Sequence, residues 1–186
     1  GMFKIIPILM GVLIAYVFAL ILLTGVVNAV NLTDGIDGLV SSVTLVVGVF
    51  FALCAFILPD MCELTVPSAL IIASSAGFLI YNFYPARVFM GDTGSMFLGG
   101  MVTALAFIMG RPELVFFFGI VYIWDAMTVV IQRVYFKLTH GKRIFRMTPI
   151  HHAFEMRGWK EVKIDFFFSL IAIIGVVLGL MYVYMA

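Results

Sequence analysis

Apolar runs of about twenty residues recur along the chain, and they limit the possible folds more than any other feature. A helix that crosses the bilayer core of about 30 Å needs roughly 20 apolar residues. Hydrophobic residues occupy 64% of the 186 positions and charged residues 11%, against about 45–50% and about 25% in soluble domains. We therefore expect an all-α, polytopic membrane helix bundle. Its six expected spans are 5–27, 39–58, 65–84, 96–109, 113–133 and 165–186.

The basic residues are distributed unevenly between the two sets of loops that six spans would create. Segments 28–38, 85–95 and 134–164 form one set, and 59–64 and 110–112 form the other. The first set, with its adjoining helix end, carries Arg87, Arg133, Lys137, Lys142, Arg143, Arg146, Arg157, Lys160 and Lys163. The other loops have only Arg111, with Lys4 near the N-terminus on the same side. Because positive loops stay in the cytoplasm, we expect the first set there and both termini outside.

The first polar segment repeats a polar side chain at every third position, at Asn28, Asn31, Asp34 and Asp37. If the helix continues through Asn31, the two asparagines share a face, since residues three apart are neighbours. Asp37 is placed to cap the next helix. One reading is a connector whose side chains only satisfy helix ends. The other is a site for Mg²⁺ and a sugar nucleotide, because hard cations prefer oxygen ligands.

The second polar segment places Asp92 between Gly91 and Gly94, immediately before an apolar run. Backbone N–H groups at a helix start favour phosphate, and Asp92 is suited to hold a metal that bridges it. The segment is not a Walker loop, because no Gly-Lys-Ser/Thr follows. The alternative is that Asp92 or Ser95 acts only as a helix N-cap.

The third polar segment contains the adjacent histidines His151 and His152. Thr148 and Pro149 suit the start of a short helix, and Gly158 suits its end. The alternative to a site is an amphipathic interfacial helix whose basic surroundings bind anionic lipid. Zinc is disfavoured, because no third ligand follows at a recognised spacing.

A polar stripe also runs along the fifth apolar segment, where Asp125, Thr128 and Gln132 follow at helical spacing. A carboxylate within a membrane segment is costly and marks a functional interior face. Asp125 could instead satisfy a break in the helix, so its role stays open. Gln132, near the cytoplasmic end, is placed to hydrogen-bond a polar ligand.

Three motifs together resemble a known family. They are Asn-Leu-Thr-Asp-Gly-Ile-Asp-Gly-Leu at 31–39, Phe-Met-Gly-Asp-Thr-Gly-Ser at 89–95 and Thr-Pro-Ile-His-His-Ala-Phe-Glu at 148–155. In this order, the chain resembles the C-terminal part of the phospho-MurNAc-pentapeptide translocases (MraY), over essentially its whole length. The first two motifs are shared with the wider polyprenyl-phosphate hexosamine-1-phosphate transferases. The third, followed by Gly158-Trp159, is more specific to the muramoyl branch.

The resemblance implies an enzyme of peptidoglycan synthesis in the bacterial inner membrane, with its active face in the cytoplasm. Such an enzyme transfers phospho-MurNAc-pentapeptide from UDP-MurNAc-pentapeptide to undecaprenyl phosphate and gives lipid I and UMP. The resemblance implies Mg²⁺ as cofactor, and as partners an N-terminal half of the same enzyme and a second copy. Residues 1–186 would form one transmembrane domain within a ten-helix fold. No nucleic-acid partner is expected.

The resemblance also implies roles for particular residues. Asp92 and Asp34 would hold the metal, and with His151 they would form the catalytic set. Phe89 would stack on the uracil base beside Asp37 and Gln132. The full set of expected substrate-binding residues is Asn28, Asn31, Gly35, Asp37, Phe89, Gln132, His151 and His152.

Two departures from the family pattern keep other functions open. The family has three consecutive histidines, and here Ala153 stands in the third place. The family also carries a paired-aspartate motif, and this chain contains no Asp-Asp pair. The missing pair permits a non-catalytic scaffold. A sister enzyme that transfers GlcNAc-1-phosphate is the close alternative, and a transporter is less favoured because the polar clusters lie at the helix ends.

Overall fold

Every regular element in the structure, a computed structural model that describes residues 2–185, is a helix. Five helices are long and apolar enough to cross a membrane, or six with one bent pair counted as a single span. The prediction of an all-α polytopic membrane protein is thus confirmed. The long helices are α1 (Met2–Thr33), α2 (Leu39–Ile57), α3 (Thr65–Asn82), α4 (Gly91–Ile108), α6 (Ile120–Leu138) and α8 (Glu161–Met185). The short elements are η1 (Pro59–Leu64), η2 (Pro112–Leu114), α5 (Val115–Phe118) and α7 (Ile150–Glu155).

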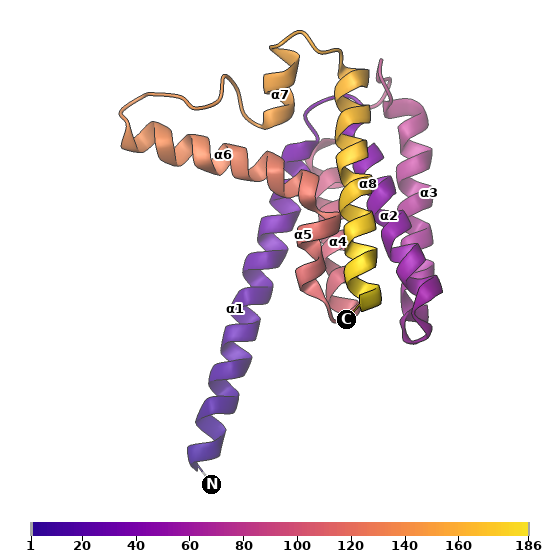
Figure 1. The fold of residues 1–186 in the computed structure, drawn as a ribbon, viewed down its shortest axis with the longest axis vertical. Coiled ribbons are helices and arrows are strands. Elements are labelled where there is room, and N and C mark those ends of the chain that lie inside the picture. The colour runs from indigo at the N-terminus through magenta and orange to yellow at the C-terminus, as the bar shows by residue number, and fades with distance from the viewer. Residues whose placement is uncertain (1, 186) are drawn as a thin grey trace.

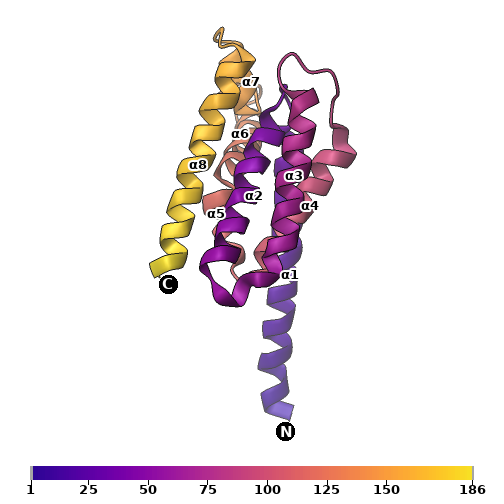
Figure 2. The same cartoon turned by 90° about the vertical axis from the view of Figure 1, so that its right-hand side faces the viewer.

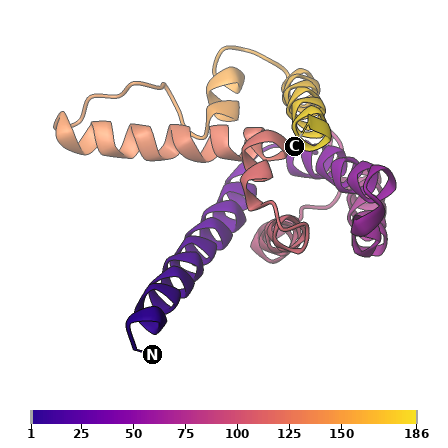
Figure 3. The ribbon, with the colours of Figure 1, turned by 60° about the horizontal axis from the view of Figure 1, so that its bottom comes forward.

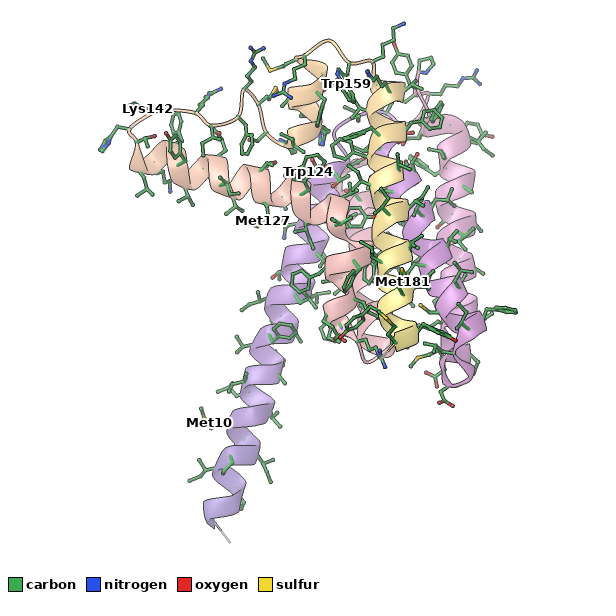
Figure 4. All side chains as sticks on the ribbon, in the orientation of Figure 1. Met10, Trp124, Met127, Lys142, Trp159 and Met181 are labelled. Atoms are coloured by element: carbon green, nitrogen blue, oxygen red, sulfur yellow. The ribbon has the colours of Figure 1, made fainter. Side chains whose placement is uncertain are left out.

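Helices α2, α3, α4, α5 and α8 stand side by side as a bundle (Figures 1 and 2). Helix α1 packs against α4 with its C-terminal part and extends well past the bundle with its N-terminal part. Residues 5–18 of α1 are exposed on every side, and the labelled Met10 lies on this free portion (Figure 4). The two ends of the chain point to the same end of the bundle (Figure 1).

Aromatic and close backbone contacts hold the centre of the bundle. The rings of Phe50 and Phe51 on α2 lie 5.3 and 5.0 Å from that of Phe118 on α5, and all three are fully buried. Helix α8 approaches α5 so closely that a Cβ at Gly175 would lie 2.3 Å from the carbonyl oxygen of Phe117. Only glycine fits at this crossing.

The span expected over 113–133 is not one continuous helix. The chain bends by 86° between the short α5 segment and α6, and Figures 1 and 3 show α6 extending sideways away from the bundle. The turn is at Gly119, where a Cβ would lie 2.6 Å from the carbonyl oxygen of Val115. Past this turn, Met127, Val130 and Val134 are exposed and follow one another at helical spacing along one side of α6. Such a one-sided apolar face is typical of a helix that lies along an interface.

Two helices reach further into the polar motifs than the apolar runs predicted. Helix α1 continues to Thr33, six residues past its expected end, and α4 begins at Gly91, five residues before its expected start. Asn28, Asn31 and Asp92 are therefore held on helices. This regular backbone fixes their directions more firmly than a loop would.

Candidate active site

The polar motifs converge at the end of the bundle opposite the chain termini. Side-chain to backbone hydrogen bonds join the loop after α1 to two distant segments. The amide of Ala86 donates to Asp37 Oδ2 at 2.8 Å, and the amide of Asp37 donates to Glu161 Oε2 at 3.2 Å. Asp37 is thus a tether between segments and does not cap α2, whose N-cap is Gly38 with no side-chain bond.

Asn82, a buried residue at the end of α3, ties the two pocket-forming loops together. Its Oδ1 accepts from the Gly38 amide at 3.2 Å and from Ser41 Oγ at 3.3 Å. Its Nδ2 donates to the Val88 carbonyl at 3.0 Å. The motifs did not predict this residue. An amide at the end of an apolar run was the only available signal.

Asn31 connects α1 to the start of α4. Its Nδ2 lies 3.1 Å from Asp92 Oδ1 and 2.9 Å from Ser95 Oγ, and it donates to both. Ser95 is buried, and its hydroxyl donates to the Gly91 carbonyl at 3.1 Å. Neither Asp92 nor Ser95 caps α4, whose N-cap is Met90. The Asp92 carboxylate is therefore oriented by a neighbouring helix.

Asp34 and Asp92 face a common polar pocket of about 240 Å³. Burial, with repulsion from the Asp92 carboxylate as the smaller cause, raises the pKa of Asp34 to about 6. Phe89, with 76% of its surface exposed, stands at this pocket. The other residues that line it include Gly35, Asp37, Asn82 and Gly91. Two nearby carboxylates with an amide donor behind one of them make a site that a cation would stabilise.

Both histidines of α7 approach the same loop from the other side. A Cβ at Gly35 would lie 2.2 Å from His151 Nε2 and 3.0 Å from His152 Nε2. His151 is fully buried, with its Nδ1 3.0 Å from Asp125 Oδ2. His152 is only partly buried, and its Nδ1 pairs with Glu155. The structure therefore brings His151 and His152 together with Gly35.

An aromatic cluster holds α7 in this position. The Phe154 ring lies 4.9 Å from Trp159, 5.6 Å from Phe167 and 6.2 Å from Trp124. Trp124 in turn stacks on Phe168 of α8 at 5.2 Å. Figure 4 labels Trp124 on α6 and Trp159 beyond α7. Helix α7 begins at Ile150 with Pro149 as its N-cap, so Thr148 is not the cap and Pro149 is not the first helical residue.

Two expected substrate-binding residues lie apart from the Asp34 and Asp92 pocket. Gln132 Oε1 accepts from the amides of Ile144 and Phe145, at 3.0 and 2.9 Å. Its side chain lines a separate basic hollow of about 390 Å³ between α6 and the following loop. Asn28 is exposed on α1, and its Nδ2 donates to the Thr24 carbonyl at 2.7 Å. Neither residue lines the pocket.

The family model described as glycosyl transferase family 4 matches residues 1–110, which is more than half of the chain. The chain belongs to glycosyl transferase family 4. The matched region includes Asn31 and the three pocket carboxylates Asp34, Asp37 and Asp92.

Relatives of this glycosyl transferase family 4 chain share about half of its residues. It is 47% identical to a phospho-N-acetylmuramoyl-pentapeptide-transferase of Acetivibrio thermocellus, over 87% of this chain and 49% of that protein. It is 50% identical to the protein of the same name from Clostridium acetobutylicum, over 80% and 46%. It is 46% identical to the protein of the same name from Clostridioides difficile, over 91% of this chain and 49% of that protein. The chain spans about half the length of these curated relatives, and the resemblance predicted from its motifs is confirmed.

The oxygen donors of this family 4 pocket fit magnesium. Among residues 2–185, no group of three or more His, Cys, Asp or Glu side chains is arranged to enclose a metal ion. Mg²⁺, however, is commonly bound by one or two carboxylates together with substrate phosphates and water. Asp34 and Asp92 supply two such carboxylates on a pocket wall. Burial first, and repulsion from Asp92 second, raise the pKa of Asp34 to about 6.

Proposed function

We propose that this chain contributes the metal and nucleotide site of an enzyme that makes lipid I. The reaction transfers phospho-MurNAc-pentapeptide from UDP-MurNAc-pentapeptide to undecaprenyl phosphate, releases UMP and serves peptidoglycan synthesis. The observation that carries this proposal is the convergence of Asp34 and Asp92 on one polar pocket, with the α7 histidines behind the same loop. The names of the relatives support the choice of substrate.

In this proposal Asp92 and Asp34 hold Mg²⁺, and Asn31 keeps the Asp92 carboxylate turned toward it. When bound, Mg²⁺ would neutralise the charge that develops on the diphosphate. Phosphoryl transfer depends mainly on such electrostatic stabilisation and on positioning. The exposed Phe89 ring offers a face on which the uracil base stacks. His151 and His152 complete the phosphate or sugar side of the site. Asn28, Asn31, Gly35, Asp37 and Gln132 remain proposed substrate-binding residues.

Location and partners belong to the same proposal. The basic residues gather at the pocket end of the bundle, so the positive-inside rule places this end in the cytoplasm and both termini outside. The membrane is the bacterial inner membrane, and residues 1–186 act as one membrane domain. The proposed protein partners are an N-terminal half of the same enzyme and a second copy. The exposed first half of α1 offers apolar surface for such contacts.

A substrate-competition assay tests the reaction. The chain is combined with a separately expressed N-terminal half of a relative, and UMP release is followed with UDP-MurNAc-pentapeptide or UDP-GlcNAc as donor. We expect release only with the muramoyl donor, lipid and Mg²⁺ present. Consumption of UDP-GlcNAc instead would transfer the proposal to the sister reaction, and release with neither donor would favour a scaffold.

The chain by itself is expected to release little UMP, because it contains no adjacent aspartate pair. The same assay without the N-terminal half measures this directly. Full turnover by the purified 186-residue chain would contradict the proposed need for that pair.

A further inference from the structure

Asp125 is a buried carboxylate that has no role in the proposed reaction. It lies in α6, and neither it nor His151 has any exposed side-chain surface. Asp125 Oδ2 lies 3.0 Å from His151 Nδ1. A carboxylate that accepts this hydrogen bond requires a proton on His151 Nδ1. In the neutral ring the lone pair is then on Nε2, an atom that is itself buried.

The contacts of Asp125 exclude its assignment to the helix break. The hydrogen bond of its side chain goes to α7, and no hydrogen bond joins its carboxylate to residues 115–121 around the turn. Its other oxygen, Oδ1, has no partner among the described residues, and neither has His151 Nε2. Buried polar groups are nearly always hydrogen-bonded, so two unpaired atoms in one buried pair require an explanation.

His151 Nε2 faces the loop that carries Asp34. The ring approaches Gly35 so closely that no side chain fits at this position. Asp34, the residue before it, belongs to the pocket wall with Asp92. Rotation of the His151 ring would turn Nε2 away from the loop, and the Asp125 contact opposes that rotation.

We propose that Asp125 is a positioning residue that acts through His151. It keeps the proton on Nδ1 and holds the ring so that Nε2 faces Gly35, in the loop over which the phospho-sugar ligand binds. Asp125 does not touch the substrate. The functional part of this inference rests on the proposed transferase activity, but the proton position does not.

Nitrogen NMR of the histidine rings tests the proton position without any turnover. The chain has three histidines, so ¹⁵N-histidine labelling in detergent micelles gives a spectrum that single variants can assign. We expect the His151 proton on Nδ1 in the wild type, and on Nε2, the form favoured in water, in Asp125→Ala. Asp125→Leu fills the site with apolar atoms and is expected to give the same change.

Asp165→Asn is the matched control, because Asp165 is also a buried carboxylate but bonds to Ser42 Oγ, at 3.1 Å. It is expected to leave the His151 signals unchanged. A wild-type His151 with its proton on Nε2 alone would overturn the proposal even if the Asp125 variants do not fold. An unchanged His151 signal in a folded Asp125 variant would also overturn it.

A double-mutant cycle in the completed enzyme tests the functional part. Asp125→Leu is expected to lower kcat about 100-fold, the scale of a lost acid, base or orienting group. KM for the nucleotide donor should stay within about threefold, as for an interaction made only in the transition state. In a His151→Ala background the same substitution should have no further effect on kcat. Additive losses would show that Asp125 does not act through His151. Absence of UMP release from the wild type would instead refute the proposed function and leave the NMR result standing.

Discussion

The Asn31 amide shows how one side chain sets the geometry of the candidate site. It reaches from α1 to two residues of α4 and donates to both Asp92 and Ser95. The Asp92 carboxylate is otherwise exposed, and an exposed side chain samples several rotamers. These bonds restrict the Asp92 side chain before a metal ion binds, so less of its conformational entropy is lost on binding.

Replacement of Asp92 by Asn is expected to lower Mg²⁺-dependent UMP release by the completed enzyme by about 100-fold or more, because the amide removes a charged ligand from the phosphoryl-transfer site. The release assay across a Mg²⁺ titration measures the loss. Asp60→Asn, an exposed aspartate in η1 at the opposite end of the bundle, is the control and should keep wild-type turnover. Normal turnover by the Asp92 variant would remove this residue from the metal site.

Replacement of Gly35 by Ala should distort the pocket, because the new Cβ would lie 2.2 Å from His151 Nε2. His151 cannot move aside easily, since it is buried and paired with Asp125. Overpacking of this kind costs about 1–3 kcal/mol, so the midpoint of thermal unfolding in detergent should fall. Gly100→Ala is the control, because nothing lies within 4 Å of its Cβ position. Equal midpoints for the two variants would contradict the contact.

The pKa of Asp34 gives a pH dependence with a definite sign. Burial raises this pKa from 3.8 to about 6 in the metal-free chain, so below pH 6 the carboxyl group is mostly protonated and a metal must displace the proton. Mg²⁺ affinity, measured by calorimetry, should therefore be constant above about pH 7 and fall as the pH drops through about 6. Asp34→Asn should bind more weakly and lack this step. An affinity that rises toward low pH would refute the ligand assignment.

At the level of helices, the length and apolar content of the runs predicted five continuous spans but did not predict the bend within 113–133. Length and apolar content are enough to predict a span that is one straight helix, such as α2 or α3. In the segment 113–133 the apolar residues first occupy all faces of the helix and then mainly one face. Gly119 permits the turn between these two parts. A window average hides this change of pattern. Helix ends were also displaced, because polar residues at the α1 and α4 termini find partners across helices.

The close crossing of α8 and α5 predicts a further glycine effect. Gly175→Ala would place a Cβ 2.3 Å from the Phe117 carbonyl oxygen, and backbone cannot yield as a side-chain tip does. The two helices would have to separate, with a loss of about 1–3 kcal/mol and a lower unfolding midpoint in detergent. Gly77→Ala in α3 has nothing within 4 Å of its Cβ position and should be nearly neutral. A stable Gly175 variant would mean that α5 does not pack as described.

For the whole molecule, the gathering of polar segments at one end was predictable and the links between them were not. Helical spacing and loop order placed Asp34, Asp92 and His151 at the same end. The partners that orient them, such as Asn31 for Asp92 and Asp125 for His151, depend on how distant helices pack. The only signal of the Asn82 tether in the sequence is an amide at the end of an apolar run. Gln132 was assigned to the pocket by resemblance, whereas its neighbours here are the amides of the following loop.

Cysteine labelling in oriented vesicles tests this arrangement. The thiols introduced singly by Asp92→Cys and His152→Cys should both react with an impermeant reagent applied to the cytoplasmic face. The native Cys62 is exposed and belongs to η1, the connection between α2 and α3, which lies at the other end of the bundle (Figure 1), so it should react only from outside. Reaction of positions 92 and 152 from opposite faces would separate the motifs and end the proposal of a shared site.

The bonds of Asn82 to both pocket loops mean that these loops do not open independently. A movement of one loop that displaces the Asn82 side chain also disturbs its bond to the other loop, since the same amide group bonds to Gly38 and to Val88. The two loops would then open together when a ligand enters the pocket. The two loops should share one exchange rate for their protected amide hydrogens, and a bound nucleotide should slow both by the same factor.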